Sequence, residues 1–202
     1  MRWEQRFCFC FTHTRTISQL VHCPAGKFHA SISDDFSSVN GWIGGKLESS
    51  VVYYGSFLGR YGKGTLTNGQ DTWKTFTING QAESVTFDVH RIDSWDGEDF
   101  NAYINDVLAF STIFRFGVSI VSASGANNGF SWSITPKDSR APRGFGDKTD
   151  WDEQTATVSI AMPAGISTIK LGFGSNLDLN QNDESYGIDN LLISTCAGPY
   201  LC

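Results

Sequence analysis

The chain has 202 residues, a formal net charge of −6 and 13% aromatic residues. This acidic balance, with no Lys/Arg run, excludes the basic surface that nucleic-acid binding usually requires, and no apolar run is long enough to span a bilayer. Thr, Ser, Val, Ile and Phe are abundant and no segment keeps a helical period, so the composition predicts strands joined by turns.

The first 30 residues differ in character from the rest of the chain, because three of the five cysteines lie there. The five are Cys8, Cys10, Cys23, Cys196 and Cys202. Clustering at both ends predicts disulfides that fasten the termini, and hence an extracellular or cell-surface location; free thiols are the alternative. We expect a Cys-containing arm or linker at 1–30, a globular domain at 31–195 and a Cys-containing tail at 196–202.

Within 31–195, nine segments combine β-branched and aromatic residues with Gly, Asn or Asp at their ends. They are 51–58, 72–78, 83–92, 100–104, 107–114, 129–135, 154–162, 167–173 and 186–194. In 83–92, Val85, Phe87 and Val89 alternate with polar residues and are expected to face the core, and Asn105-Asp106 predicts a tight turn. The pattern predicts an all-β fold, an antiparallel β-sandwich of the jelly-roll kind.

The segment DSWDGE (93–98) directly follows the strand expected at 83–92. Continuing the alternation puts Asp93 on the core face, so Asp93, Asp96 and Glu98 are expected at one rim of the sandwich. Partly burying these carboxylates together costs several kcal/mol without compensation. A hard cation removes that cost, and Ca²⁺ suits such loops because it takes six to eight oxygen ligands.

Two further segments are rich in side-chain oxygen atoms: DLNQNDESYGIDN (178–190) and Ser33-Asp34-Asp35. Three acidic clusters in one sandwich favour a calcium site over Zn²⁺ or Cu²⁺, which prefer His or thiolate ligands. For each cluster the alternative is a solvated acidic turn or a salt bridge, for example between Asp93 and Arg91 or Arg115.

Several segments together resemble a jelly-roll module of bacterial and protist surface proteins, similar to concanavalin-like and laminin-G-like lectin domains and to carbohydrate-binding modules. The segments are DDFSSVNGW (34–42), GSFLGRYG (55–62), TFTI (75–78), DSWDGEDFNAYIN (93–105) and DESYGIDNLLI (183–193). The resemblance spans about residues 31–195. It implies an extracellular, calcium-stabilised β-sandwich used in adhesion, glycan binding or surface assembly. The implied metal ligands are Asp35, Asp93, Asp96, Glu98, Asp183, Glu184 and Asp189.

These observations favour a noncatalytic binding module whose partner is a glycan or neighbouring copies of the chain in a surface fibre. Glycan sites combine an aromatic platform with polar groups. The aromatic residues considered for such a platform are Trp42, Tyr53, Tyr54, Trp95, Trp132 and Trp151, and Trp95 and Trp151 are the ligand-binding candidates. The alternative is a glycoside hydrolase on a concanavalin-like fold that uses Asp96 and Glu98. Phe100 stands where the third carboxylate of that enzyme pattern is expected.

Overall fold

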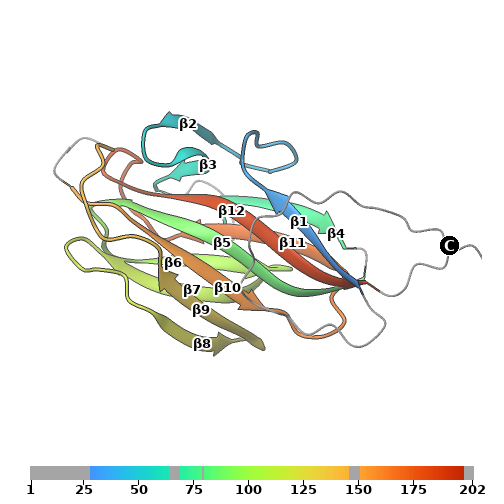
Figure 1. Cartoon of the computed structure of the whole chain (residues 1–202). Helices are drawn as coiled ribbons and strands as arrows, with labels where there is room; N and C mark the ends of the chain where they lie inside the picture. Colours follow the sequence, from blue (N-terminus) through green and yellow to red (C-terminus); the bar gives the residue numbers. More distant parts are fainter. Residues whose placement is uncertain (1–27, 64–68, 79, 146–150, 198–202) are drawn as a thin grey trace, which may run out of the picture.

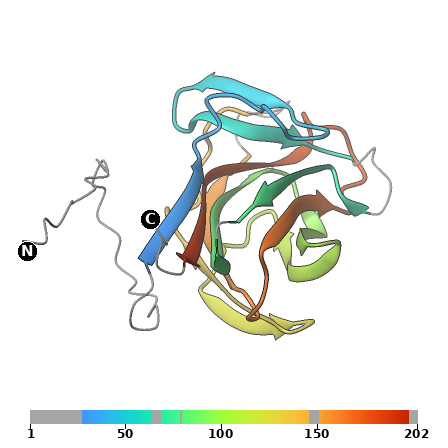
Figure 2. The same cartoon turned by 90° about the vertical axis from the view of Figure 1, so that its right-hand side faces the viewer.

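The computed structural model describes residues 28–63, 69–78, 80–145 and 151–197 (Figure 1). The regular elements in these ranges are strands, arranged in two antiparallel sheets that pack face to face (Figure 2). The predicted all-β sandwich is therefore confirmed. Within the described ranges, no helix has the length and apolar character needed to cross a bilayer.

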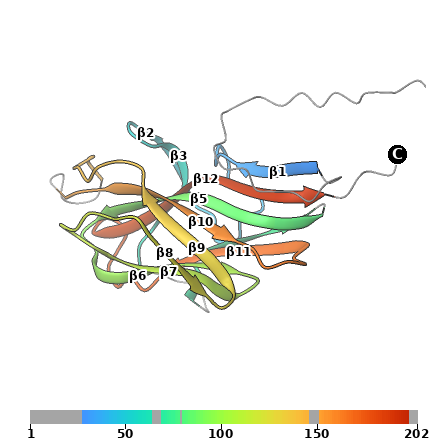
Figure 3. The ribbon, with the colours of Figure 1, turned by 60° about the horizontal axis from the view of Figure 1, so that its bottom comes forward.

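The large sheet contains eight strands. Their order is β2 (Leu47–Val51), β3 (Gly55–Tyr61), β12 (Glu184–Ala197), β5 (Gln81–Asp93), β10 (Gln154–Ala161), β9 (Phe130–Pro136) and β8 (Ala123–Asn127), and β1 (Phe28–Asp34) also pairs with β12. Strand β12 is shared along one edge, because β3 pairs with it near its start and β1 pairs over the rest of its length (Figure 3). The two longest strands, β12 and β5, thus form the centre of the sheet.

The small sheet contains four strands. Their order is β4 (Thr72–Thr77), β11 (Thr168–Ser175), β6 (Asp96–Ile104) and β7 (Val107–Arg115). The chain crosses repeatedly between the sheets, and the shortest crossing joins β5 to β6 through Ser94 and Trp95 alone. The segment DSWDGE, expected to be a loop, is this crossing: Asp93 ends one strand, and Asp96 begins the next.

The core lies between the sheets and follows the predicted alternation. Val85, Phe87 and Val89 are fully buried on β5. From the small sheet, the Phe173 ring packs edge-on against Phe87 with centroids 4.9 Å apart. Burial of such apolar surface is the main force that holds the two sheets together.

The predicted strands differ from the observed ones mainly at the sheet margins. Strands β1, β2 and β8 were not predicted, and β1 and β12 pair from Phe28 opposite Ala197, beyond the expected domain limits of 31 and 195. The tight turn at Asn105 and Asp106 is confirmed, since both residues have the positive φ angles (52° and 65°) of a two-residue hairpin turn. Most of the expected arm and tail lies outside the described residues.

Candidate functional site

Two acidic segments that are distant in the sequence meet at one rim of the sandwich, where β5 passes into β6 and β12 begins. Glu184 lies opposite Asp93 in the pairing of β12 with β5. Ser94 donates to the carbonyl oxygen of Asp183 from its backbone N–H at 3.1 Å and from its hydroxyl at 2.8 Å. The structure thus brings residues 93–98 and 183–184 side by side, as the cation hypothesis requires.

Five of the seven predicted metal ligands lie at this rim, at different depths. Asp93 and Glu184 are buried, with 0% and 1% of their surface exposed, whereas Asp96 is exposed and Glu98 and Asp183 are half-buried. Glu98 Oε2 accepts hydrogen bonds from the backbone N–H groups of Asp96 and Gly97 at 2.6 and 3.0 Å. One oxygen of Glu98 therefore already stabilises the start of β6.

The other two predicted ligands lie elsewhere. Asp189 faces Asp88 on the large sheet, and the exposed Asp35 accepts a hydrogen bond from the Ser37 N–H at 3.0 Å, which lowers the pKa of Asp35. Among the described residues, no three His, Cys, Asp or Glu side chains are arranged to hold one metal ion. The seven-residue set stays a prediction, and the structure distributes its members over separate places.

Asp93 lies against a carboxylate that the sequence analysis did not single out. Glu153, directly before β10, is fully buried like Asp93, and the two side chains interact directly. We call these two residues the rim pair. In the described part of the chain, none of their four carboxylate oxygens has a hydrogen bond of ordinary geometry, although the backbone N–H groups of Arg143 and Phe145 lie close enough to Glu153 to lower its pKa. Burial, with the charge of Glu153, raises the pKa of Asp93 to about 8, and burial also raises the pKa of Glu153.

Two arginines lie near the rim pair, but their guanidinium groups bind other partners. Arg60 donates to the carbonyl oxygen of Gln181 and to Oδ1 of Asn182, both at 3.1 Å. Arg143 forms a salt bridge with Asp138 at 2.8 Å. Within the described residues, neither arginine forms a salt bridge with the rim pair, so its charge is not neutralised by close contact.

Glu184 organises the turn that precedes β12. Its Oε1 accepts hydrogen bonds from the backbone N–H groups of Asp178 and Leu179, both at 2.9 Å. Burial raises the pKa of Glu184, and the nearby negative charge of Glu98 adds to this rise. Glu184 therefore combines a structural role with the acidic character of the rim.

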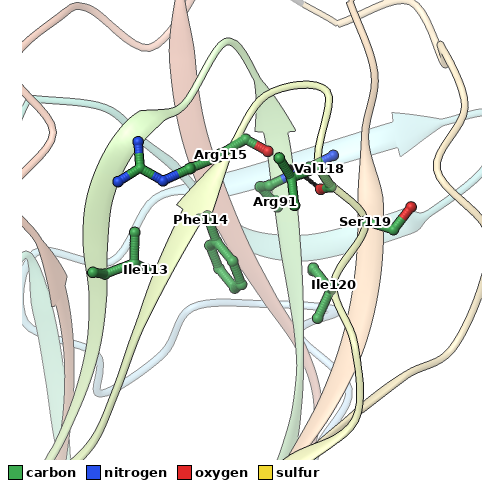
Figure 4. A pocket seen from close by; sticks show the side chains of 7 residues that line it. All are labelled: Arg91, Ile113, Phe114, Arg115, Val118, Ser119 and Ile120. Carbon is green, nitrogen blue, oxygen red and sulfur yellow. Dashed lines mark hydrogen bonds between the residues drawn. The ribbon is translucent and has the colours of Figure 1, made fainter.

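Arg91 does not pair with Asp93, which was one alternative from the sequence. It binds Asp152 at 2.5 Å and also donates to the carbonyl oxygens of Arg115 and Val118, both at 2.6 Å. Arg91 lines a pocket of about 300 Å³ beside the segment that follows β7, and Figure 4 shows the side chains that line it. These bonds anchor that segment, so we assign Arg91 a structural role.

Asp88 is the centre of a polar network on the outer face of the large sheet, away from the small sheet. Its Oδ2 accepts hydrogen bonds from Lys137 Nζ at 2.5 Å and Asn190 Nδ2 at 2.8 Å, and its Oδ1 accepts one from Thr157 Oγ1 at 2.6 Å. Burial raises the pKa of the neighbouring Asp189 to about 6, with the charge of Asp88 contributing. The network holds donors and acceptors in fixed positions on the sheet surface.

Aromatic side chains surround a buried histidine beside this network. The ring of His90 lies 4.3 Å from that of Tyr54 and 5.1 Å from that of Phe57, measured between centroids, and Phe145 packs against both aromatic rings. His90 Nδ1 lies 3.0 Å from Thr155 Oγ1. Burial lowers the pKa of His90 to about 3, so the imidazole is neutral near physiological pH.

The exposed aromatic ring next to this cluster belongs to Tyr53, which is 66% exposed. The Arg143 guanidinium lies 5.8 Å from the centre of the Tyr53 ring and 5.3 Å from that of Tyr54. Trp95, a predicted ligand-binding residue, is instead fully buried, and its Nε1 donates to the Ser185 carbonyl oxygen at 2.9 Å. That prediction is wrong because the chain turns inward as it crosses between the sheets. Trp151 is half-buried and stays a candidate.

The sequence patterns missed Glu153, and they placed two aromatic candidates for a glycan site, Tyr53 and Tyr54, in the wrong element. Glu153 lies in the run WDEQT beside another carboxylate, and no alternation marks which of the two turns inward. Tyr53 and Tyr54 stand in an aromatic segment that was assigned to a strand, whereas the structure places them in the turn between β2 and β3. The turn exposes Tyr53 and leaves Tyr54 packed on His90.

Cys196, near the end of β12, is almost fully buried and disulfide-bonded. The other four cysteines lie outside the described residues, so the pairing stays a prediction.

Comparisons with known proteins give one distant likeness. No family model matches the chain, and no curated protein matches it. Among solved structures, the C-terminal CBM6 of LamC, a marine laminarinase from Zobellia galactanivorans, matches with 14% sequence identity and a TM-score of 0.40, covering 82% of this chain and 99% of that chain. At this level of similarity, nothing about binding is carried over from that protein.

Proposed function

We propose that this chain is a noncatalytic glycan-binding β-sandwich module that works outside the cell and binds its ligand on the outer face of the large sheet. The observation that carries the proposal is the Asp88 network lying beside the Tyr53, Tyr54 and Arg143 cluster. His90 connects the two, because it lies two residues after Asp88 on β5 and its ring is 4.3 Å from that of Tyr54.

This arrangement matches the chemistry of a sugar. A sugar ring presents C–H groups that stack on an aromatic face and hydroxyl groups that need both donors and acceptors. The exposed ring of Tyr53 offers the first. Lys137, held by Asp88 but half exposed, offers donors, and the exposed Asn190 and the half-buried Asp189 offer acceptor oxygens.

The bonding of the carboxylates supports binding rather than hydrolysis. Asp88 already accepts three side-chain hydrogen bonds, which suits a fixed group better than one that must exchange a proton with substrate. At the rim, Glu98 of the alternative hydrolase pair holds two backbone N–H groups through Oε2. The disulfide at Cys196 supports an oxidising compartment. Adhesion and assembly of a surface fibre would be uses of the same binding module.

The test is binding of the full chain to a panel of soluble polysaccharides and immobilised glycans. We expect retention on at least one glycan and at least a tenfold loss of affinity for Tyr53→Ala, about 1.4 kcal/mol. Phe116→Ala is the matched control, because it removes another partly exposed ring, 42% exposed, from the segment after β7. The proposal would be contradicted if Phe116→Ala weakened glycan binding as much as Tyr53→Ala does. It would also be contradicted if the wild-type chain bound none of the glycans.

A further inference from the structure

We propose that the rim pair, Asp93 and Glu153, binds one hard divalent cation, with Ca²⁺ as the best-suited ion. This inference does not depend on glycan binding. It agrees with the cofactor predicted from the sequence but centres the site on Glu153, a residue outside the predicted ligand set. The first reason is direct: both side chains are fully buried and interact with each other, and among the described residues none of their four oxygens has a hydrogen bond of ordinary geometry.

The rest of the protein shows how unusual this arrangement is. Asp152, the neighbour of Glu153, binds Arg91 through Oδ1 and Arg140 through Oδ2, both at 2.5 Å. Glu184 uses one oxygen to accept two backbone hydrogen bonds. Among the described residues, Asp93 and Glu153 are the carboxylates with both oxygens buried and without a hydrogen bond of ordinary geometry. Buried carboxylates in native structures are normally satisfied, so each of these oxygens points to a missing partner.

The position of the pair explains what an ion would do there. Asp93 ends β5, and Glu153 precedes β10, the next strand of the sheet, where Gln154 pairs with Arg91. An ion held between the two side chains would tie the start of β10 to the crossing between the sheets. It would also cancel the repulsion between two negative charges in a site of low dielectric constant.

The donor set selects the class of ion. The pair offers oxygen atoms only, which Ca²⁺ and Mg²⁺ prefer, whereas Zn²⁺ favours imidazole and thiolate ligands. Ca²⁺ accepts mono- and bidentate carboxylates in irregular geometry, and backbone carbonyls and water can complete its shell. Mg²⁺ requires a near-octahedral shell and gives up its water reluctantly, which a buried pair does not suit.

The competing explanation is that the two carboxyl groups share a proton. Thermal unfolding of the full chain distinguishes a shared proton from a bound ion. The Tm is measured at about pH 7.5, first in EGTA and then with millimolar CaCl₂. At a CaCl₂ concentration well above the Kd of the site, we expect a rise in Tm of about 5 °C or more. Isothermal titration calorimetry should give one ion per chain. MgCl₂ should produce a much smaller rise.

Glu153→Gln keeps the size of the side chain and should abolish the calcium-dependent rise in Tm. Glu98→Gln is the matched control: it removes a rim carboxylate that belonged to the predicted ligand set and should leave the rise intact. If Glu153→Gln does not fold, Asp93→Asn and the titration of the wild-type chain provide the same test. An unchanged wild-type Tm in CaCl₂, or a rise lost in Glu98→Gln and kept in Glu153→Gln, would overturn the proposal.

Discussion

Asp88 and Asp93 lie five residues apart on the same strand, are both buried, and have opposite surroundings. Asp88 accepts hydrogen bonds from Lys137, Thr157 and Asn190. Asp93 accepts no hydrogen bond of ordinary geometry from the described residues, and its close neighbour is another carboxylate, Glu153. One strand thus uses the same side chain in two ways: once in a network that is complete, and once in a site that needs a proton or an ion.

The two aspartates differ in whether a ligand is needed to complete their interactions. On the outer face, the protein supplies every partner of Asp88, so the surface is preorganised and a ligand adds contacts without correcting any deficit. At the rim, the buried carboxylates of Asp93 and Glu153 lack hydrogen bonds of ordinary geometry from the described residues, so a ligand that binds there changes the stability of the whole sandwich. Binding to the outer face should therefore be visible in affinity, and binding to the rim in stability.

The largest effect is expected from Asp88→Ala. This change leaves Lys137, Thr157 and Asn190 without their shared acceptor, and we expect a loss of roughly 3 kcal/mol in the free energy of unfolding, because a hydrogen bond to a charged group contributes about 1.5–3 kcal/mol. Urea denaturation near neutral pH measures it. A loss below about 0.5 kcal/mol, the usual range of a surface substitution, would show that the network is not preorganised.

Asp93→Asn should behave differently. The pKa of Asp93 in the folded wild-type chain, about 8, lies above the ordinary value of 3.8. The stability that Asp93 contributes is therefore intact at low pH and is lost as the pH rises through the folded pKa. In EGTA, the wild-type chain should lose about 2 kcal/mol between about pH 6.5 and 8.5. Asp93→Asn should remove most of this loss. Equal slopes for the two proteins would contradict the assigned environment of the rim pair.

His90 should act in the opposite pH range. Its folded pKa of about 3 lies below the ordinary value of 6.5, so the stability that it contributes is present above the ordinary value and is lost as the pH falls toward the folded one. Relative to His90→Gln, the wild-type chain should lose roughly 1–2 kcal/mol between about pH 7 and 5. Subtracting the unfolding free energy of His90→Gln from that of the wild-type chain removes the contributions of Asp71 and Asp189, whose pKa values are raised to about 6. A constant difference across this range would place His90 in solvent.

The smallest effect is expected at Trp95. Trp95→Phe keeps an aromatic ring but removes the hydrogen bond to the Ser185 carbonyl oxygen and leaves a small cavity, so we expect a loss of about 1–2 kcal/mol. Glycan binding should be unchanged, because the side chain is fully buried. A loss of binding without a loss of stability would instead restore Trp95 as a ligand-binding residue.

The sequence was most informative where residues alternate over a long strand. The pattern in β5 correctly predicted the buried face of Val85, Phe87 and Val89 and the arrival of Asp93 at the rim. Strands β1 and β8 were missed because FHASISD and ASGAN carry few apolar residues. Pairing with β12 and β9, not intrinsic propensity, makes them strands.

The rim pair was only half predictable. Asp93 follows from a local pattern, but Glu153 comes from a segment about sixty residues away in the sequence, which the pairing of β10 with β5 brings to the same rim. No local feature distinguishes Glu153 from Asp152, and the structure gives them opposite roles. Strand register alone does not decide which carboxylate meets Asp93: continued from Gln154 opposite Arg91, it would put Asp152 there, and the chain leaves strand geometry at Asp93, whose φ angle is 66°.

A crystal structure of the full chain grown with CaCl₂ at about pH 7.5 is the most direct test of the cation site. We expect one ion within about 2.3–2.6 Å of carboxylate oxygens from both Asp93 and Glu153. Two carboxyl groups in direct hydrogen-bonding contact, with no ion between them, would contradict it.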